Sequence, residues 1–390
     1  MFHFDKDFVN KNNECLMLPI RFKSLLKRLN SEYVIKSEIL TGDFEYLEKE
    51  CTYNEAIQDN DWILFKSDKD LWGKKDQFVW FRQTITIPSS FKDESVWYIV
   101  NPYLDRQWPW GQPQIEMFVN GKCRCGLDNN HPSHLLIKKA KGNETITIYL
   151  KAYCDRTYYN GQMTMSATLQ IIRPEIYDFY KSIDLPLRAC SLMNTDSDSR
   201  IKIIKALNNA MNALDLYEDP DSIIFEKSMN KAKEILDNEL YNNDSSKPIL
   251  YSIGHSHIDV AWLWTYRVTR NKAARTFATN IDLIENNPDY LFMSSQPQLY
   301  EYVKEDEPEL YEKIKKAIKD NRWEVEGGMW VEADTNITSG ESLVRQFLFG
   351  KRFFKEEFNK ENEVLWLPDV FGYSANLPQI CQKSGIKYFY

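Results

Sequence analysis

The sequence contains no run of about 18 apolar residues, so nothing in it predicts a helix that spans a membrane. Its first residues lack a cationic stretch followed by an apolar one, and we therefore expect no signal peptide. Basic residues are outnumbered, with 49 Lys and Arg against 57 Asp and Glu, which leaves a net charge of −8. Because phosphate groups are bound by cationic surfaces, we expect neither nucleic acid nor a membrane as a partner.

Cysteine is also scarce. The seven cysteines are an odd number, are scattered along the chain, and include no Cys-x-x-Cys motif. Disulfide scaffolds and zinc ribbons need regular cysteine pairs, so we expect reduced thiols in a cytoplasmic protein. Cys123 and Cys125 lie close together, but no second pair is near them, which argues against a zinc knuckle.

The length of 390 residues exceeds that of one ordinary domain, since domains of about 100–200 residues are typical. The period of the hydrophobic pattern changes near residues 180 and 248. These changes predict a multidomain protein that contains both α and β structure. We expect an amino-terminal extension (1–44), a jelly-roll-like β-sandwich (45–178), a helical connector (179–248) and an α/β catalytic domain (249–390).

Short strands with no helical period between them predict the β-sandwich. The segment 78–87 alternates apolar and polar residues after an aromatic start, and turn signals such as Asn120-Gly121 separate later strands. The stretch Trp108-Pro-Trp-Gly could stack on a sugar, although packing in a core or between domains is the commoner use of such rings. In the connector, two apolar stripes at helical spacing predict two amphipathic helices, with caps at 197–199.

After Pro248 strands and helices alternate, which predicts a parallel sheet with crossover helices, either as an open sheet or as a barrel. Functional sites in such folds form at the carboxyl ends of the strands. We expect strands at 249–254, 290–293, 323–325, 364–367 and 388–390. We expect helices through 275–285, at 308–321, from a cap at Ser339 to about 358, and at 377–384.

Three potential metal ligands follow the first of these strands. Because side chains alternate along a strand, His255, His257 and Asp259 would project to one side. Imidazole together with carboxylate suits zinc, cobalt or manganese. The alternative is an ordinary buried histidine that is hydrogen-bonded to an aspartate.

Acidic and aromatic residues follow the later strands. Asp369, directly after the fourth strand, could be a ligand, a nucleophile or both, or else a helix N-cap or turn residue. The segment GGMWVEAD after the third strand adds Trp330, Glu332 and Asp334 to the same rim. An exposed tryptophan among carboxylates is typical of a sugar subsite.

The ordered segments GHSHIDVAWLW, ARTF, SSQPQLYEY, GGMWVEAD, SGESLVRQFLFG and WLPDVFGYSANLPQI resemble the α-mannosidases of glycoside hydrolase family 38, most of all the branch of cytosolic and vacuolar enzymes. The resemblance covers residues 249 to 390, and the upstream part is similar more loosely. It implies that the α/β domain is an incomplete seven-stranded (β/α) barrel.

The resemblance also implies site residues. Zinc, with cobalt as an alternative, would be held by His257, Asp259 and Asp369. Asp369 would also be the catalytic nucleophile. Trp262 would line the subsite for the mannose that is cleaved, with Trp330 and Asp334 as further substrate-binding residues. His255 would then support the site without being a ligand.

The implied reaction is metal-dependent, retaining hydrolysis of terminal α-linked mannose from oligosaccharides, by an enzyme that forms a homo-oligomer when full length. Retention needs two carboxyl groups about 5–5.5 Å apart. In the family an acidic residue and a further His ligand lie well downstream of the nucleophile, but this sequence has no histidine after Asp369. We therefore expect this chain to be an amino-terminal portion with little or no activity of its own.

Two other functions fit the same residues. A metal-dependent carbohydrate deacetylase also uses Asp and His on a strand-helix barrel, and it would release acetate instead of mannose. A non-catalytic sugar-binding fragment would bind mannosides and never hydrolyse them.

Overall fold

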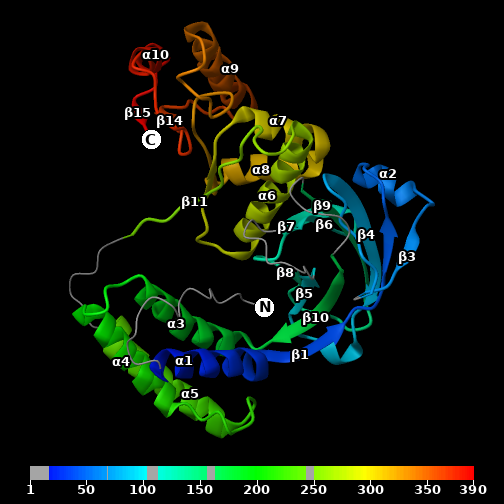
Figure 1. The fold of residues 1–390 in the computed structure, drawn as a ribbon, viewed down its shortest axis with the longest axis vertical. Helices are drawn as coiled ribbons and strands as arrows, with labels where there is room; N and C mark the ends of the chain where they lie inside the picture. The colour runs from blue at the N-terminus through cyan, green and yellow to red at the C-terminus, as the bar shows by residue number, and fades with distance from the viewer. Residues whose placement is uncertain (1–16, 68, 103–112, 156–162, 243–249) are drawn as a thin grey trace.

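A computed structural model describes residues 17–67, 69–102, 113–155, 163–242 and 250–390. The protein is a mixed α and β structure in which sheets and helices are arranged in three groups (Figure 1). Trp108 and its neighbours lie outside the described residues, as does most of the expected linker before Pro248. The cysteines in the described ranges are free thiols. No helix among these residues is both long and apolar enough to cross a membrane.

The first group consists of two antiparallel sheets. One sheet has six strands in the order β3-β2-β4-β9-β6-β7, and the other has four in the order β1-β10-β5-β8. The strands are β1 (Ile35–Leu40), β2 (Phe44–Leu47), β3 (Ile63–Phe65), β4 (Gln77–Thr86), β5 (Val96–Asn101), β6 (Gln114–Val119), β7 (Lys122–Leu127), β8 (Ser133–Ile137), β9 (Thr145–Cys154) and β10 (Ser166–Ile172). The short helix α2 (Tyr53–Gln58) and a 3₁₀ turn at Ser89–Phe91 lie between strands.

One hydrophobic core holds the two sheets face to face. It contains side chains from β4 and β9 of the larger sheet and from β5 and β10 of the smaller one. The aromatic start of β4 does not alternate because both of its faces are buried. Val79 and Phe81 point into the shared core, whereas Trp80 packs under α2 and Phe78 packs against the α/β part.

The β6–β7 hairpin turns at Asn120-Gly121, as the sequence predicted, with positive φ at both residues. The strands begin earlier than residue 45, however. β1 pairs with β10, and the expected boundary falls inside β2. The sequence pattern missed β1 and β3 because short strands at a sheet edge carry little alternating signal.

The second group consists of four helices around one core. They are α1 (Met17–Arg28), α3 (Pro174–Ser191), α4 (Asp198–Ala213) and α5 (Ile223–Leu236). Ser197 caps α4 as predicted, and the two predicted stripes are α4 and α5. The sequence pattern predicted neither α1 nor α3. Helix α1 lies in the expected amino-terminal extension, whereas α3 begins five residues before the expected start of the connector and contains a proline inside the helix. Residues from both ends of the sandwich sequence therefore join this cluster.

The third group alternates short parallel strands with helices. β11 (Gly254–His255), β12 (Phe292–Ser294) and β13 (Trp323–Val325) pair in this order, and β14 (Val364–Leu365) pairs with β15 (Tyr388–Phe389). A parallel bridge between Gly327 and Leu365 connects the two sets. The helices are α6 (Tyr266–Asn286), α7 (Pro297–Asp306), α8 (Pro308–Lys319), α9 (Gly340–Phe358) and α10 (Leu377–Lys383).

Strands and helices alternate as the sequence predicted, and Ser339 caps α9 as predicted. Two details differ. The first strand contains only residues 254 and 255, so the chain has left the sheet before the metal-ligand candidates that follow. Helix α7 was not predicted. It begins at Pro297, directly after the left-handed residue Gln296, and no capping side chain marks its start.

Helix α6 lies against the outer face of the larger sheet (Figure 1). The backbone N–H of Gly126 donates to Thr279 Oγ1 at 2.8 Å, and a Cβ atom at Gly126 would lie 3.2 Å from Arg275 Cβ. Asn271 Nδ2 donates to Glu116 Oε2 at 2.6 Å. The sandwich therefore supports the helix that follows the first candidate ligands.

Candidate metal centre

His257 and Asp259 lie on the segment that leaves β11 at its carboxyl end. The carbonyl oxygen of Asp259 accepts a hydrogen bond from Thr269 Oγ1 in the first turn of α6 at 3.1 Å. Trp264 Nε1 donates to the same hydroxyl at 3.0 Å. The start of α6 therefore holds the backbone of this segment in place.

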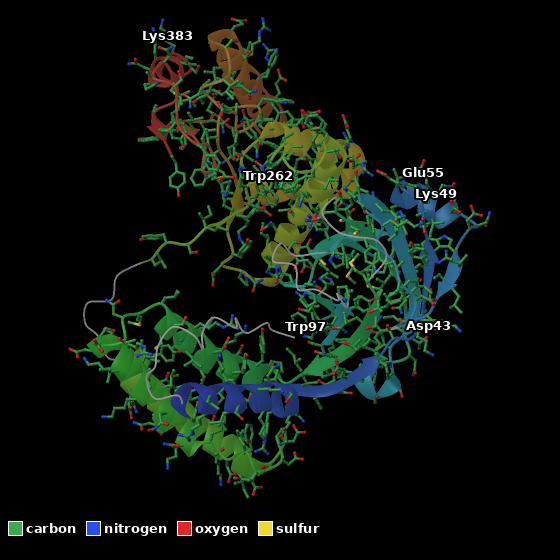
Figure 2. The ribbon with its side chains drawn as sticks, in the orientation of Figure 1. Asp43, Lys49, Glu55, Trp97, Trp262 and Lys383 are labelled. Atoms are coloured by element: carbon green, nitrogen blue, oxygen red, sulfur yellow. The ribbon has the colours of Figure 1, made fainter. Side chains whose placement is uncertain are left out.

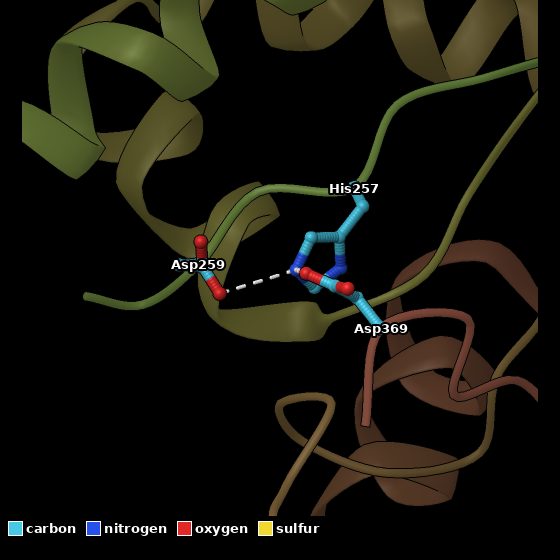
Figure 3. Close-up of side chains that lie close together, drawn as sticks. All are labelled: His257, Asp259 and Asp369. Carbon is cyan, nitrogen blue, oxygen red and sulfur yellow. Dashed lines mark hydrogen bonds and ion pairs between the residues drawn. The ribbon is translucent and has the colours of Figure 1, made fainter. Parts of the chain in front are cut away.

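Asp369 follows β14 and reaches the same edge of the parallel strands. One potential ligand atom from each of His257, Asp259 and Asp369 lies within 4.8 Å of the other two (Figure 3). His257 Nε2 is 3.2 Å from Asp259 Oδ1 and 3.5 Å from Asp369 Oδ2. Three side chains from distant parts of the sequence therefore converge on one point.

This donor set fits a divalent ion. Zinc takes imidazole nitrogen and carboxylate oxygen at about 2.0–2.2 Å, and tetrahedral ligands at that bond length stand about 3.4 Å apart. The two separations from His257 Nε2, 3.2 and 3.5 Å, are close to that value. The Asp369 side chain is 50% exposed and that of Asp259 is 34% exposed. Solvent and ligands therefore reach both carboxylates.

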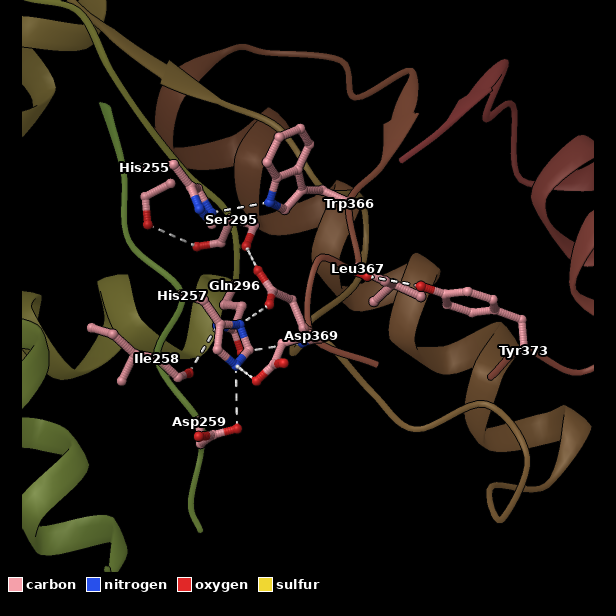
Figure 4. A network of polar contacts seen from close by, with 12 residues as sticks. His255, His257, Ile258, Asp259, Ser295, Gln296, Trp366, Leu367, Asp369 and Tyr373 are labelled. Atoms are coloured by element: carbon pink, nitrogen blue, oxygen red, sulfur yellow. Dashed lines mark hydrogen bonds and ion pairs between the residues drawn. The ribbon is translucent and has the colours of Figure 1, made fainter. Parts of the chain in front are cut away.

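His255 is placed apart from this group. Trp366 Nε1 donates to His255 Nε2 at 3.0 Å, and the two rings meet at 61° with centroids 5.0 Å apart (Figure 4). Burial lowers the pKa of His255, which favours the neutral ring that accepts this hydrogen bond. Strand alternation predicted that His255 would project with the other two residues. That alternation does not continue past His255, because β11 ends there.

Glu332, which the sequence placed at the same rim without a role at the metal, contacts His257. Its Oε2 contacts His257 Nδ1, and its side chain is only 2% exposed. Burial of the imidazole opposes its charge, but Glu332 and then Asp259 outweigh burial and raise the pKa of His257 to about 9. The only sequence signal was the position of Glu332 after β13, at the expected rim.

Sequence comparison matches the last 144 residues of the chain to a family. Residues 247–390 match the model of the glycosyl hydrolases family 38 N-terminal domain. Alpha-mannosidase G of Dictyostelium discoideum is 30% identical over 353 residues, which are 87% of this chain and 31% of the relative. Human alpha-mannosidase 2C1 is 31% identical over 86% of this chain and 32% of its own length. Residues 247–390 belong to glycoside hydrolase family 38.

The alpha-mannosidase of Saccharomyces cerevisiae is 39% identical over 198 residues, which are 47% of this chain and 18% of that protein. The chain thus spans about a third or less of each of these relatives. Among solved structures, a β-glucuronidase from Ruminococcus gnavus aligns with 35% of this chain and 29% of its own, at 9% identity and a TM-score of 0.24. This TM-score is too low to assign a fold.

The family 38 motifs contain the three residues that converge in the structure. His257 and Asp259 belong to GHSHIDVAWLW, and Asp369 belongs to WLPDVFGYSANLPQI. Trp262, from the first motif, lies on the same loop ahead of α6 (Figure 2). It is 59% exposed and meets Trp264 edge to face, with ring centroids 5.6 Å apart. Its exposed surface is available for stacking on a ligand.

The other two expected substrate-binding residues of this family 38 domain have partners within the fold. Trp330 Nε1 donates to Gln298 Oε1 at 3.1 Å, and its ring meets Phe353 edge to face. Trp330 also lines a hollow of about 430 Å³ beside α9. Asp334 Oδ1 accepts the backbone N–H groups of residues 336 and 337 at 2.8 and 3.0 Å, the pattern of an Asx turn. Both residues therefore have structural roles, and any sugar contact would be additional to these.

Proposed function

We propose that this chain is the amino-terminal part of a zinc-dependent, retaining α-mannosidase that removes terminal α-linked mannose from oligosaccharides. The observation that carries the proposal is the convergence of His257, Asp259 and Asp369 within 4.8 Å, in a domain that matches family 38. Cobalt, which accepts the same donor types, is the alternative ion.

The arrangement of the strands supports a barrel for the α/β domain of the parent enzyme. β11, β12 and β13 pair in chain order, and the bridge from Gly327 to Leu365 continues that order to β14 and β15. An open, doubly wound sheet reverses its order at a switch point, whereas a (β/α) barrel adds each strand beside the previous one. We propose that these strands are the first units of the seven-stranded barrel.

In the proposed mechanism Asp369 attacks the anomeric carbon. Its side chain is half exposed and stands at the carboxyl edge of the strands, where a sugar can approach. A second carboxyl group, about 5–5.5 Å away, would protonate the departing oxygen and then activate water. Trp262 would stack on the apolar face of the sugar and exclude water. His257, Asp259 and Asp369 would hold the zinc ion, which would supply Lewis-acid stabilisation of the bound sugar.

Further parts of the proposal concern the whole enzyme. We propose a homo-oligomer when full length, with a mannose-containing oligosaccharide as its partner, and a cytoplasmic location that the scattered free thiols support. The 390-residue chain itself should hydrolyse aryl α-mannosides weakly or not at all. A missing general acid costs about 10²–10⁴-fold in rate, and this sequence has no histidine after Asp369 to complete the ligand set.

The test of the proposal uses zinc binding and turnover together. The metal-free chain should bind zinc in competition with a chromophoric chelator, and Asp369→Asn or His257→Ala should weaken binding by at least about 10-fold, because each removes one ligand of an incomplete site. Asp320→Asn, at the exposed residue directly after α8, is the matched control and should bind zinc as the unaltered chain does.

An extended protein that continues past residue 390 should release mannose from an aryl α-mannoside with retention, and Asp369→Asn should abolish that release without unfolding the protein. Release of acetate from an acetylated sugar would instead support a deacetylase. Mannoside binding without any turnover by the extended protein would support a sugar-binding fragment. Zinc affinity that does not change in the Asp369 and His257 variants would refute the metal centre.

A further inference from the structure

We infer that Glu332 is a positioning residue for the metal centre. Its buried carboxylate holds Nδ1 of His257 and thereby directs Nε2 of the same ring toward Asp259 and Asp369. This inference rests on the proposed function, because it supposes that the three residues hold a divalent ion.

The two carboxylate oxygens of Glu332 have separate partners. Oε2 contacts His257 Nδ1, and Oε1 accepts a hydrogen bond from Ser295 Oγ. The Glu332 side chain is 2% exposed, and Ser295 is 3% exposed. A carboxylate that is shielded from water and held at both oxygens has little freedom to rotate. It therefore holds the imidazole in one orientation.

Gln296 holds the backbone of the two segments that carry Glu332 and His257. Its Oε1 accepts the backbone N–H of Glu332 at 3.1 Å, and its Nε2 donates to the carbonyl oxygen of Ile258 at 3.0 Å. Ile258 lies between the two ligands His257 and Asp259. Gln296 is 2% exposed and has a φ of 62°, a left-handed conformation that costs a non-glycine residue free energy. One buried side chain therefore ties the Glu332 segment to the ligand segment.

The close approach of Ser295 depends on a glycine. Gly327 has a φ of +132°, and a Cβ atom there would lie 2.6 Å from Ser295 Cβ. The chain can therefore bring Ser295, which follows β12, directly beside the segment that follows β13. The ends of three adjacent strands each supply one part of the arrangement: His257 after β11, Ser295 after β12 and Glu332 after β13.

The chemistry of imidazole explains why this matters for a metal. A neutral ring carries one N–H group, and a metal ligand must present the other nitrogen as a lone pair. A carboxylate at Nδ1 accepts the N–H there, so in the neutral ring the lone pair is on Nε2, the nitrogen that faces the two aspartates at 3.2 and 3.5 Å. Carboxylates behind metal-binding histidines act in this way, and their loss costs about 10–100-fold in metal affinity.

The experiment measures zinc affinity of the metal-stripped 390-residue chain by competition with a chromophoric chelator. Glu332→Ala should weaken zinc binding by about 10–100-fold. Glu332→Gln should weaken it less, because the amide oxygen can still accept the N–H of His257 Nδ1. Because zinc affinity is measured without turnover, the result does not depend on the enzymatic activity of this chain.

Glu326→Gln is the matched control. Glu326 is a partly buried glutamate that also follows β13, but its Oε2 accepts hydrogen bonds from the backbone N–H of Val364 at 3.3 Å and from Asn362 Nδ2 at 3.4 Å. This variant should bind zinc as the unaltered chain does. The melting temperature of each metal-free protein shows whether the fold is retained, and Glu332→Gln decides the result if Glu332→Ala does not fold.

The outcomes separate the two hypotheses. Zinc binding by the unaltered chain, weakened in Glu332→Gln with an unchanged metal-free melting temperature, supports the positioning role. Equal zinc affinity in the unaltered chain and both Glu332 variants overturns it and leaves the proposed function standing. Equal weakening by Glu326→Gln also overturns it, because any buried carboxyl group in this region would then suffice. Failure of the unaltered chain to bind zinc overturns the proposed metal centre itself.

Discussion

Glu326 and Glu332 lie on one short segment after β13, and both are at least partly buried, yet their partners give them different roles. Glu326 binds the backbone that leads into β14, so it joins two strands, and burial raises the pKa of its carboxyl group. Glu332 meets an imidazole that faces two aspartates. At the scale of the residue, the partner decides what a buried carboxylate does.

Gly327 allows a first prediction from geometry at this scale. Gly327→Ala should lower the free energy of unfolding by about 1–3 kcal/mol, because a side chain at a φ of +132° is strained and its Cβ would clash with Ser295. Urea denaturation measures the change. Gly340→Ala is the control, since it begins α9 and its Cβ would have no neighbour within 4 Å. Equal destabilisation by the two substitutions would show that strain at Gly327 is unimportant.

Helix α6 has two roles at the scale of the element. Its first turn holds the Asp259 backbone through Thr269, and its middle lies on β6 and β7 of the sandwich. Between them a buried polar contact joins Asn271 to Glu116, whose carboxyl pKa is raised by burial. A buried carboxyl group without a hydrogen-bond partner is costly, so this contact matters for the docking of the helix.

We therefore predict that Asn271→Leu lowers the free energy of unfolding by about 1–3 kcal/mol, because it leaves Glu116 without its donor on α6. The double variant Asn271→Leu with Glu116→Leu should recover most of that loss, since replacement of both partners removes the buried polar pair. Chemical denaturation of the two single variants and the double variant gives the coupling free energy between Asn271 and Glu116. Additive losses would contradict the prediction.

At the scale of the whole molecule, separate hydrophobic cores serve the sandwich, the helical cluster and the α/β part. Polar contacts connect them. Arg173 binds Asp221 at 2.7 Å where the sandwich strands pass into the helices. His134 on β8 lies 3.7 Å from Asp282 on α6. Burial, with Arg124 nearby, lowers the pKa of His134 to about 4, so this ring is neutral in the folded protein near neutral pH.

This histidine predicts a loss of stability in mild acid. The unfolded chain takes up a proton at His134 near pH 6.5, whereas the folded chain does so only near a pKa of about 4. Between these values the unfolded state binds more protons, so the free energy of unfolding falls as the pH falls. Burial also raises the pKa of Asp282, the carboxyl group that faces this ring. The contribution should be about 2 kcal/mol between about pH 7.5 and pH 5.

Urea denaturation at the two pH values measures this loss, and His134→Gln should show a smaller loss than the unaltered chain. His131→Gln is the matched control on the preceding turn. That ring is 81% exposed, and its hydrogen bond to Asp128 raises its pKa, so its contribution has the opposite sign and is small. An equal pH dependence in the unaltered chain and His134→Gln would contradict the prediction.

The sequence predicted elements well where a local pattern repeats. The alternating run of β4, the stripes of α4 and α5 and the cap at Ser339 all appear where they were expected. It failed for α1, which joins a core supplied mostly by residues far along the chain, and for β1, which pairs with β10. In both cases a partner that lies far along the chain decides where the element packs.

The sequence by itself determined the residue types and strand positions that made His257, Asp259 and Asp369 candidates, since motif spacing is a local property of the chain. Only the tertiary structure decided which of the candidates lie together. Strand alternation predicted that His255 would join His257 and Asp259, but β11 ends at His255 and its ring contacts Trp366 instead. The contact between Glu332 and His257 depends on the register of three parallel strands and on a glycine that admits Ser295. Such contacts are set by packing between segments far apart in the chain, which no local pattern encodes.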